Sequence, residues 1–314
     1  MDLFTHFLVP FIILFFIGCE KPLAGGLGGI SIDFDVLLIG IGFLFPYLFI
    51  FTHRGITHSF IFGFMAAVIF LYIISRKPVT EFISKIIKRD FNIEFTWKTI
   101  FLAYFGVLLH LLLDFFTTGG IPLLYPFSLT KFSGELYYYT DFVTTLVSLA
   151  VLVIIYLKIN LKYKKIVMIL FLIMLISFGG IRAYEKNNAI NALETNLNEN
   201  FTEISAYPTS DMFIWKLVLF DPKNQKYGVY TYYNLNQTKK LQGYYNKTTV
   251  IGNYSEGMDA VSKADELEAV RSFKWESFYT GVIAQEQSKQ WKITYFDFLG
   301  NHFQPNNITV YVNN

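Results

Sequence analysis

The amino-acid sequence predicts a membrane α-helical bundle of about five to six helices, including an N-terminal hairpin, followed by an extracytoplasmic β-rich α+β domain. Composition is the first observation behind this fold class. Of the 314 residues, 53% are hydrophobic and only 16% are charged, whereas soluble domains carry about 25% charged residues. The second observation is that the bias is uneven: long apolar runs fill residues 1–181, and shorter segments rich in aromatic and β-branched residues fill residues 182–314. These ranges are the two expected domains.

Six runs that are almost free of charge lie in the first domain, at residues 7–18, 36–51, 60–74, 100–113, 142–157 and 166–181. A helix that crosses the hydrocarbon core needs about 20 residues, with a range of roughly 17–25. The last four runs reach this length once their flanks are included. We therefore expect them to span the membrane.

The first run predicts one arm of a tight helical hairpin, over residues 3–18, with a second arm over about 22–32. Small residues in the stretch LAGGLGG (23–29) would let the two backbones approach closely. A cleaved signal peptide is the competing interpretation. It is less favoured, because no basic segment precedes the apolar run and no clear cleavage site follows it.

Basic residues predict the orientation in the cell membrane. They concentrate in the connections 76–98 and 158–165, and connections rich in Lys and Arg usually face the cytoplasm. Residues 117–141 and the C-terminal domain are then expected outside.

The C-terminal domain is expected to be built mainly of strands. Segments 213–220, 227–235, 277–285 and 290–299 are rich in aromatic and β-branched residues, with partial alternation. Residues 259–272 have apolar residues at helical spacing and predict one helix.

Charge and cysteine content exclude several classes of function. The net charge is +2, which offers no general field to attract nucleic acid. The single cysteine, Cys19, excludes an intramolecular disulfide and any multi-cysteine metal site. No glycine-rich phosphate loop follows a predicted strand, so no organic cofactor is expected.

Seven imidazoles and carboxylates in the first domain are candidate metal ligands: His6, Asp33, Asp35, His53, His58, His110 and Asp114. Ionisable groups in apolar segments are costly and usually functional. His110 and Asp114 are four residues apart, so they share one helix face. The predicted topology places all seven at the outer membrane face, where they could bind one or two divalent cations, zinc or manganese rather than magnesium because of the imidazoles.

Two other interpretations of these residues stay open. A single histidine within a membrane is often only a hydrogen-bond partner between helices, and a carboxylate pair can cap a helix. The run 36–51 is also long enough to cross the membrane, which would separate Asp33 and Asp35 from His53. If the cluster forms, this run must be re-entrant or interfacial; Gly40, Gly42 and Pro46 make a broken helix plausible. The fifth histidine, His302, is interpreted as a surface residue.

Four motifs resemble the YdjM-like inner-membrane proteins, which are described as membrane-bound metal-dependent hydrolases. They are Thr5-His6, the IDFD stretch at 32–35, HRGITHS at 53–59 and HLLLDFFTTGGIPLLYPF at 110–127. Ile32 departs from the pattern, which has proline there. Segments 207–218 and 272–281 also resemble the C-terminal domain of that family.

The resemblance implies metal-assisted hydrolysis. A bound divalent cation would lower the pKa of a water molecule and polarise the scissile oxygen. Arg54 would neutralise a phosphate or other anion, and Thr57, Ser59 and Thr117 would donate hydrogen bonds around the site. Thr57 is also a candidate N-cap of the following helix. Because the site opens at a membrane face, we expect a lipid or lipid-linked phosphoester as substrate.

Two alternatives come from other functional classes. A transporter or channel would use the ionisable cluster as an ion site and should distribute its ligands along a path through the membrane. A non-catalytic scaffold would bind partners through its outer domain and would tolerate loss of His53 or His110. The sequence does not predict the oligomeric state.

Overall fold

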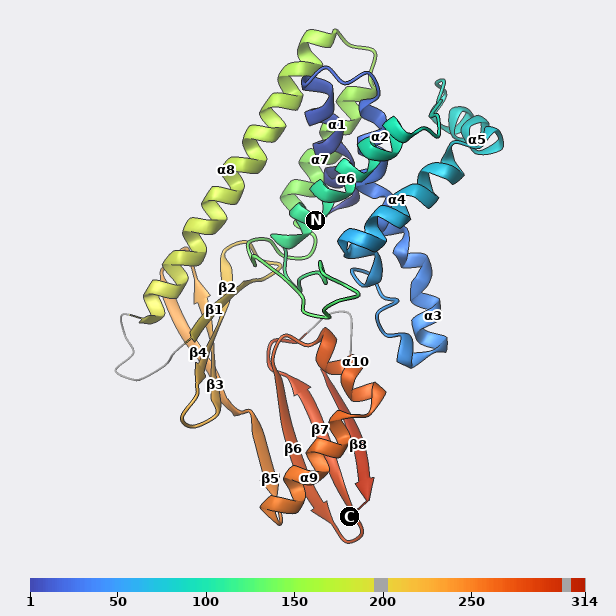
Figure 1. The fold of residues 1–314 in the computed structure, drawn as a ribbon. Helices are drawn as coiled ribbons and strands as arrows, with labels where there is room; N and C mark the ends of the chain where they lie inside the picture. Colours follow the sequence, from blue (N-terminus) through green and yellow to red (C-terminus); the bar gives the residue numbers. More distant parts are fainter. Residues whose placement is uncertain (195–202, 301–305, 314) are drawn as a thin grey trace. The chain divides into compact units, whose positions relative to one another are not determined.

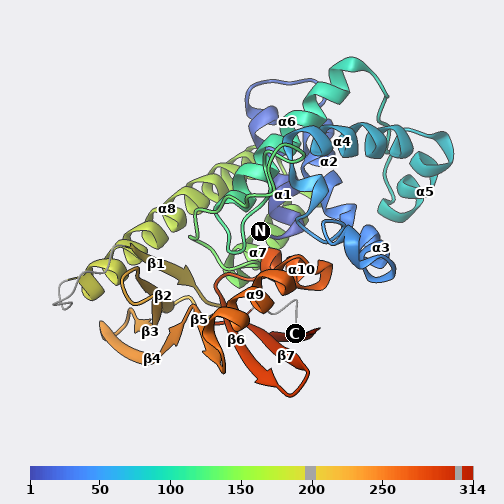
Figure 2. The same cartoon turned by 60° about the horizontal axis from the view of Figure 1, so that its bottom comes forward.

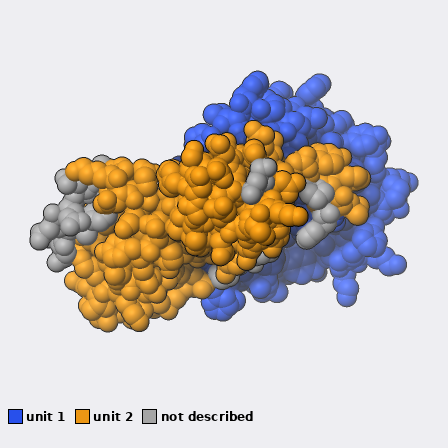
Figure 3. All heavy atoms as spheres, turned by 90° about the horizontal axis from the view of Figure 1, so that it is seen from below, with its two compact units in different colours: residues 1–41, 50–182 blue, residues 42–49, 183–314 orange. Residues whose placement is uncertain are grey.

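A computed structural model describes residues 1–194, 203–300 and 306–313 (Figure 1). His302 lies outside these residues. Contacts divide the chain into two compact units (Figure 3): unit 1 comprises Met1–Ile41 and Ile50–Arg182, and unit 2 comprises Gly42–Phe49 and Ala183–Asn314. The predicted order, a helical membrane half followed by a sheet-rich region, is confirmed.

Helical segments occupy most of the first 194 residues. They are α1 (Leu3–Phe16), α2 (Pro22–Ser31), η1 (Ile32–Leu38), α3 (Ile39–Leu44), η2 (Pro46–Leu48), η3 (Ile56–His58), α4 (Phe60–Ile74), α5 (Lys77–Ile87), α6 (Trp97–Phe115), α7 (Phe142–Tyr156) and α8 (Leu161–Glu194). Among the described residues, three segments are long and apolar enough to cross a membrane: Pro22–Gly42, Trp97–Phe115 and Leu161–Glu194. The bent pair α4–α5 would be a fourth, and α1 and α7 are shorter apolar helices.

Glycines let the N-terminal hairpin pack tightly. A Cβ atom added to Gly29 of α2 would lie 2.0 Å from the carbonyl oxygen of His6 in α1, and one added to Gly28 would lie 1.9 Å from the carbonyl oxygen of Ala103 in α6. The predicted approach of the two hairpin arms is therefore confirmed. The same glycines also bring α2 against α6, which was not predicted.

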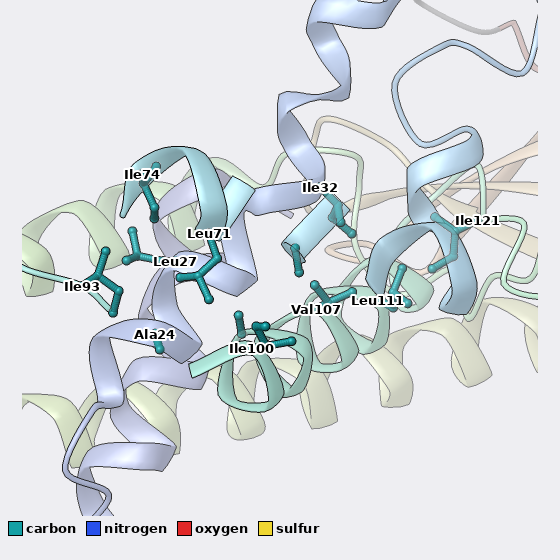
Figure 4. Packing of buried hydrophobic residues seen from close by; sticks show 12 residues of the cluster. Ala24, Leu27, Ile32, Leu71, Ile74, Ile93, Ile100, Val107, Leu111 and Ile121 are labelled. Atoms are coloured by element: carbon teal, nitrogen blue, oxygen red, sulfur yellow. The ribbon is translucent and has the colours of Figure 1, made fainter. Parts of the chain in front are cut away.

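One apolar core of unit 1 lies between α2, α4 and α6 (Figure 4), and a second is formed by α1, α7 and α8. Leu27 and Ile32 contribute from the α2–η1 segment, Leu71 from α4, and Val107 and Leu111 from α6. In lipid, close packing rather than exclusion of water drives such helix association. This core holds the helix ends that carry the ionisable cluster.

The apolar run 36–51 does not form one continuous helix. It is divided among η1, α3 and η2, and His53, which follows it, contacts Asp35. The alternative in which this run separates the two aspartates from His53 is thus excluded. The predicted break in the helix is confirmed, and a re-entrant or interfacial position of the run stays a prediction.

Two four-stranded sheets form most of unit 2 (Figure 2). The first sheet has the order β1 (Glu203–Pro208), β2 (Ile214–Asp221), β3 (Lys226–Tyr233) and β4 (Thr238–Asn246), with all neighbours antiparallel. The second has the order β5 (Thr248–Ile251), β6 (Thr280–Gln287), β7 (Gln290–Asp297) and β8 (Asn307–Asn313), in which only β5 and β6 are parallel.

The four predicted strand segments correspond to β2, β3, β6 and β7, the central strands of the two sheets. The four strands that the sequence did not predict are the edges. Edge strands are commonly short or charged: β5 has four residues, and β4 carries Lys239 and Lys240.

Residues 259–272 were expected to form one helix, and this prediction was wrong. Two helices replace it, α9 (Tyr254–Asp265) and α10 (Glu268–Glu276). Leu267, which the helical spacing placed on the buried face, is 41% exposed and precedes α10 in an extended conformation.

Candidate metal centre

Four segments of unit 1 bring ionisable side chains together. His6 comes from the first turns of α1, and Asp33 and Asp35 come from η1, directly after α2. The loop before α4 contributes His53, Arg54 and His58. His110 and Asp114 come from the last turns of α6.

The α2–α6 contact fixes the orientation of His110. Its Nδ1 lies 2.5 Å from the carbonyl oxygen of Gly29. A carbonyl can only accept a hydrogen bond, so Nδ1 donates and Nε2 faces the cluster with its lone pair. Hydrogen bonding of the other ring nitrogen is how proteins usually orient a ligating histidine.

Asp35 orients the two histidines of the loop. Its Oδ1 lies 2.8 Å from Nδ1 of His53, and its Oδ2 lies 3.1 Å from Nδ1 of His58. Oδ2 also accepts hydrogen bonds from the Thr57 hydroxyl at 2.7 Å and the Arg54 backbone at 3.2 Å. Both oxygens of Asp35 are thereby occupied, and Nε2 of His58 is left to face His110.

The loop reaches this geometry through two unusual residues. Arg54 has a φ of 63°, in the left-handed region that non-glycine residues rarely adopt. Its neighbour Gly55 has a φ of −92°, so a left-handed backbone is not the reason for glycine at this position. It is glycine because an added Cβ would lie 1.9 Å from the carbonyl oxygen of Ile50.

Four donor atoms form an inner cage: Nε2 of His58, Nε2 of His110, Oδ1 of Asp33 and Oδ2 of Asp114. The two imidazole nitrogens are 3.2 Å apart. Asp33 lies 3.8 Å from His58 and 3.5 Å from His110. Asp114 lies 3.5 Å from His58 and 3.4 Å from His110. Ligands about 2.05 Å from a tetrahedral zinc ion are about 3.3 Å apart. The two imidazole nitrogens, taken with either carboxylate oxygen, therefore have spacings close to those of ligands around one small cation.

Unpartnered buried atoms also fit a cation. Among the described residues, Oδ2 of Asp114 and both ring nitrogens of His6 are buried without a hydrogen bond. Buried polar atoms are nearly always satisfied, and an exception often marks the position of an ion or water. His6 stacks on His110 with ring centroids 3.5 Å apart, and its Nε2 lies 3.3 Å from Oδ1 of Asp114.

The charge of the cluster is acidic when the imidazoles are neutral. The cluster contains three carboxylates, on Asp33, Asp35 and Asp114, and two cationic groups, the Arg54 guanidinium and the Met1 amino group, both of which contact Oδ1 of Asp114. Three overlapping groups of these residues could hold a metal ion. They are His6, His110 and Asp114; Asp33, His58 and His110; and Asp35, His53 and His58.

A sequence model of the YdjM inner membrane protein family matches residues 1–189. This chain belongs to the YdjM family. No curated protein and no solved structure matches it. The matched range contains all seven candidate ligands, whereas the C-terminal segments 207–218 and 272–281 lie beyond it.

All seven predicted ligands of this YdjM chain lie in one cluster, although not in equivalent positions. Asp33, His58, His110 and Asp114 form the inner cage. His6 lies beside Asp114, and His53 contacts the cluster through Asp35.

Arg54 turns its side chain inward. Its Nη1 donates to Thr117 Oγ1 at 2.8 Å and to the Thr118 carbonyl at 3.1 Å. Its Nη2 donates to Asp114 Oδ1 at 3.1 Å and to the Tyr139 carbonyl at 3.2 Å. The guanidinium therefore joins the HRGITHS loop to the end of α6 and the segment after it. Anion binding by Arg54 stays a prediction, and most of its five N–H groups are already used.

The three predicted hydroxyl residues have different surroundings. Thr57 contacts Asp35, and Thr117 accepts from Arg54 and donates to the Asp114 carbonyl. Ser59 is the N-cap of α4, so the expectation that Thr57 caps this helix was wrong. Within the described residues, the hydrogen bonds of the Ser59 hydroxyl go to the backbone of Ile56 and Phe62.

The exposed fractions of the side chains show from which side a ligand can reach the cluster of seven candidate ligands. The His53 side chain is 41% exposed and that of Asp33 is 17% exposed, whereas those of His58, His110 and Asp114 are at most 1% exposed. Access is therefore past His53 and Asp33.

Sequence reasoning missed residues that support the cluster. Asp2 caps α1, which carries His6, and accepts a hydrogen bond from Ser148 of α7 at 3.0 Å. An aspartate directly before an apolar helix that begins Leu-Phe-Thr is an N-cap signal that could have identified it. The carbonyl groups of Gly29, Thr118 and Tyr139 have no signal in the sequence, because any residue supplies a carbonyl.

Proposed function

We propose that this YdjM-family chain is a membrane-bound metal-dependent hydrolase. The observation that carries the proposal is the inner cage, in which two imidazole nitrogens lie at ligand spacing from each other and from each of two carboxylate oxygens. Asp33, His58, His110 and Asp114 would hold the ion. Zinc or manganese suits such a mixed set of nitrogen and oxygen donors better than magnesium.

When bound, such a cation supplies Lewis acidity, which activates water and polarises an ester. The residues around the cage have separate tasks. Asp35 orients His58 and His53, and Arg54 holds Asp114. His53 is the exposed imidazole beside the entrance, placed to exchange a proton with a reactant through Nε2 because Nδ1 is directed at Asp35.

A lipid or lipid-linked phosphoester is the proposed substrate. It is supported by the apolar surface that η1 exposes beside its two aspartates: Phe34 is 46%, Val36 55% and Leu37 76% exposed. Phe34 and Val36 alternate with Asp33 and Asp35 along the chain and Leu37 follows them, so an acyl or isoprenoid chain could contact all three while the ester reaches the cage. The connections 76–98 and 158–165 are rich in Lys and Arg, which supports a cytoplasmic location for them. The cage and unit 2 are then proposed to lie on the extracytoplasmic side.

The transporter alternative has less support. A translocation route needs polar partners through the membrane, whereas the candidate ligands gather at one end of α4 and α6.

Hydrolysis by the full chain in nanodiscs tests the proposal. Phosphate release would be measured from a lipid phosphomonoester and from a water-soluble phosphate ester, with zinc or manganese added. We expect turnover of the lipid ester that Asp33→Asn abolishes and that the matched exposed substitution Asp90→Asn leaves unchanged. Cleavage of only the soluble ester would contradict the lipid substrate, and no cleavage of either ester by a metal-loaded chain would contradict phosphoester hydrolysis.

A further inference from the structure

Helix α5 is amphipathic and has no buried residue. Its apolar residues are Val79, Phe82, Ile83, Ile86 and Ile87, spaced i, i+3, i+4, i+7 and i+8, which places them on an arc of about 140°. Phe82 is 63% exposed and Ile86 is 62% exposed. Apolar side chains on one face of a helix are costly to leave in water. Val79 packs against the core of unit 1, but Phe82 and Ile86 need a covering that the described part of unit 1 does not provide.

Both ends of α5 lie beside the ends of apolar helices. Its first residue, Lys77, comes three positions after the end of α4, and the chain bends by 78° between the two helices. At its other end, the carbonyl of Ile87 accepts a hydrogen bond at 2.7 Å from the hydroxyl of Tyr156, the last residue of α7. Helix α5 thus runs from the end of α4 to the end of α7, and it does not continue the direction of α4.

Cationic and aromatic side chains surround α5 in the pattern of a membrane interface. Arg76, Lys77, Lys85, Lys88 and Arg89 are exposed, against Glu81 and Asp90 of opposite charge. Arg76 lies 3.6 Å from the ring centroid of Tyr72, and Arg89 lies 4.4 Å from that of Tyr156. Tyrosine and tryptophan gather where helices leave the hydrocarbon, and Trp97, at the start of α6, is 72% exposed.

We propose that α5 lies in the plane of the membrane interface, with Phe82 and Ile86 in the acyl region and its basic residues on anionic phospholipid headgroups. An apolar face flanked by Lys and Arg is how an interfacial helix binds an anionic lipid surface. This contact is independent of the metal centre, which lies at the opposite end of α4. It would fix the depth at which unit 1 sits in the bilayer.

Single-cysteine labelling of the full chain tests the position of α5. In a Cys19→Ser background, Phe82→Cys and the matched polar-face variant Glu81→Cys would each carry an environment-sensitive fluorophore. The nanodiscs would contain phosphatidylcholine with 30% phosphatidylglycerol. We expect blue-shifted emission at position 82, protected from acrylamide, and an accessible label at position 81. Equal quenching at both positions would overturn the proposal, as would protection of position 81 alone.

Lipid retention tests the anionic partner. The chain would be extracted in mild detergent from vesicles of equal phosphatidylcholine and phosphatidylglycerol, and its retained lipids measured by mass spectrometry. We expect the parent to retain phosphatidylglycerol preferentially and Lys85→Gln/Lys88→Gln to reduce this preference about tenfold, at an unchanged melting temperature. A preference that is absent in the parent, or unchanged in the variant, would overturn the headgroup contact. Metal content, measured in the same samples, reports separately on the centre.

Discussion

Charged side chains are buried at one end of α4 and exposed at the other. At its N-terminal end, His58 and the neighbouring Asp114 are at most 1% exposed. Beyond its C-terminal end, the side chains of Lys77 and Glu81 are 87% and 67% exposed. The fifteen residues of α4 separate these ends by about 22 Å. An ionisable side chain beside an apolar helix is therefore accommodated in one of two ways. At one end it is buried among partners, which produces a candidate metal centre; at the other it is exposed, and no such centre forms there among the described residues.

Loss of Asp114 should have the largest effect. Asp114→Ala would leave the buried Arg54 guanidinium without its carboxylate, and breaking a buried ion pair costs about 3–5 kcal/mol. The exposed substitution Glu81→Ala should change the free energy of unfolding by no more than about 0.5 kcal/mol. Thermal unfolding of both variants in one detergent measures the difference. Similar destabilisation by the two variants would show that the buried and the exposed carboxylate contribute equally to stability.

Arg54→Ala should weaken metal binding without removing a ligand of the inner cage. Loss of a residue that orients a ligand typically costs 10–100-fold in metal affinity, and Arg54 orients Asp114. Competition with a zinc chelator measures this affinity. Arg76→Ala, a matched change at the other end of α4, should leave it unaltered. If both variants bind zinc like the parent, Arg54 does not position Asp114.

Packing behind the cluster should also be sensitive at specific positions. In Gly28→Ala the new methyl group would meet the Ala103 carbonyl, so we expect a loss of about 1–3 kcal/mol. Among the described residues, no atom lies within 4 Å of a Cβ added to Gly40, so Gly40→Ala in α3 should be neutral or should stabilise by up to about 1 kcal/mol. Unfolding curves of the two variants test this contrast, and equal losses would contradict it.

The smallest effect is expected at the exposed end. Lys21→Gln would remove the ion pair with Glu94, whose side chains are 33% and 61% exposed. Exposed pairs contribute about 0–1 kcal/mol, and salt weakens them. The difference in melting temperature between parent and variant should therefore vanish in 1 M salt. A difference that persists would mean that this end also depends on buried charge.

Sequence patterns predicted the features that depend on the types of residue in a segment. The apolar runs, the hairpin, the central strands and the seven residues of the cluster follow from hydrophobicity, glycine content and residue type. Details that depend on tertiary contacts were not predicted. Asp33 belongs to the inner cage, whereas Asp35 orients two histidines. No local sequence pattern distinguishes the two aspartates, because their roles depend on how the loop with His53 and His58 folds back against η1. The inward turn of Arg54 depends on carbonyl groups more than 60 residues away.

Metal content decides whether the inner cage binds an ion. The full chain, purified in detergent with added zinc and manganese, would be compared by elemental mass spectrometry with His58→Ala/His110→Ala at matched thermal stability. We predict about one ion per parent chain, held by the four cage residues, and none in the double variant. A parent without a bound ion, or a double variant that keeps it, would show that these four residues do not form a metal site.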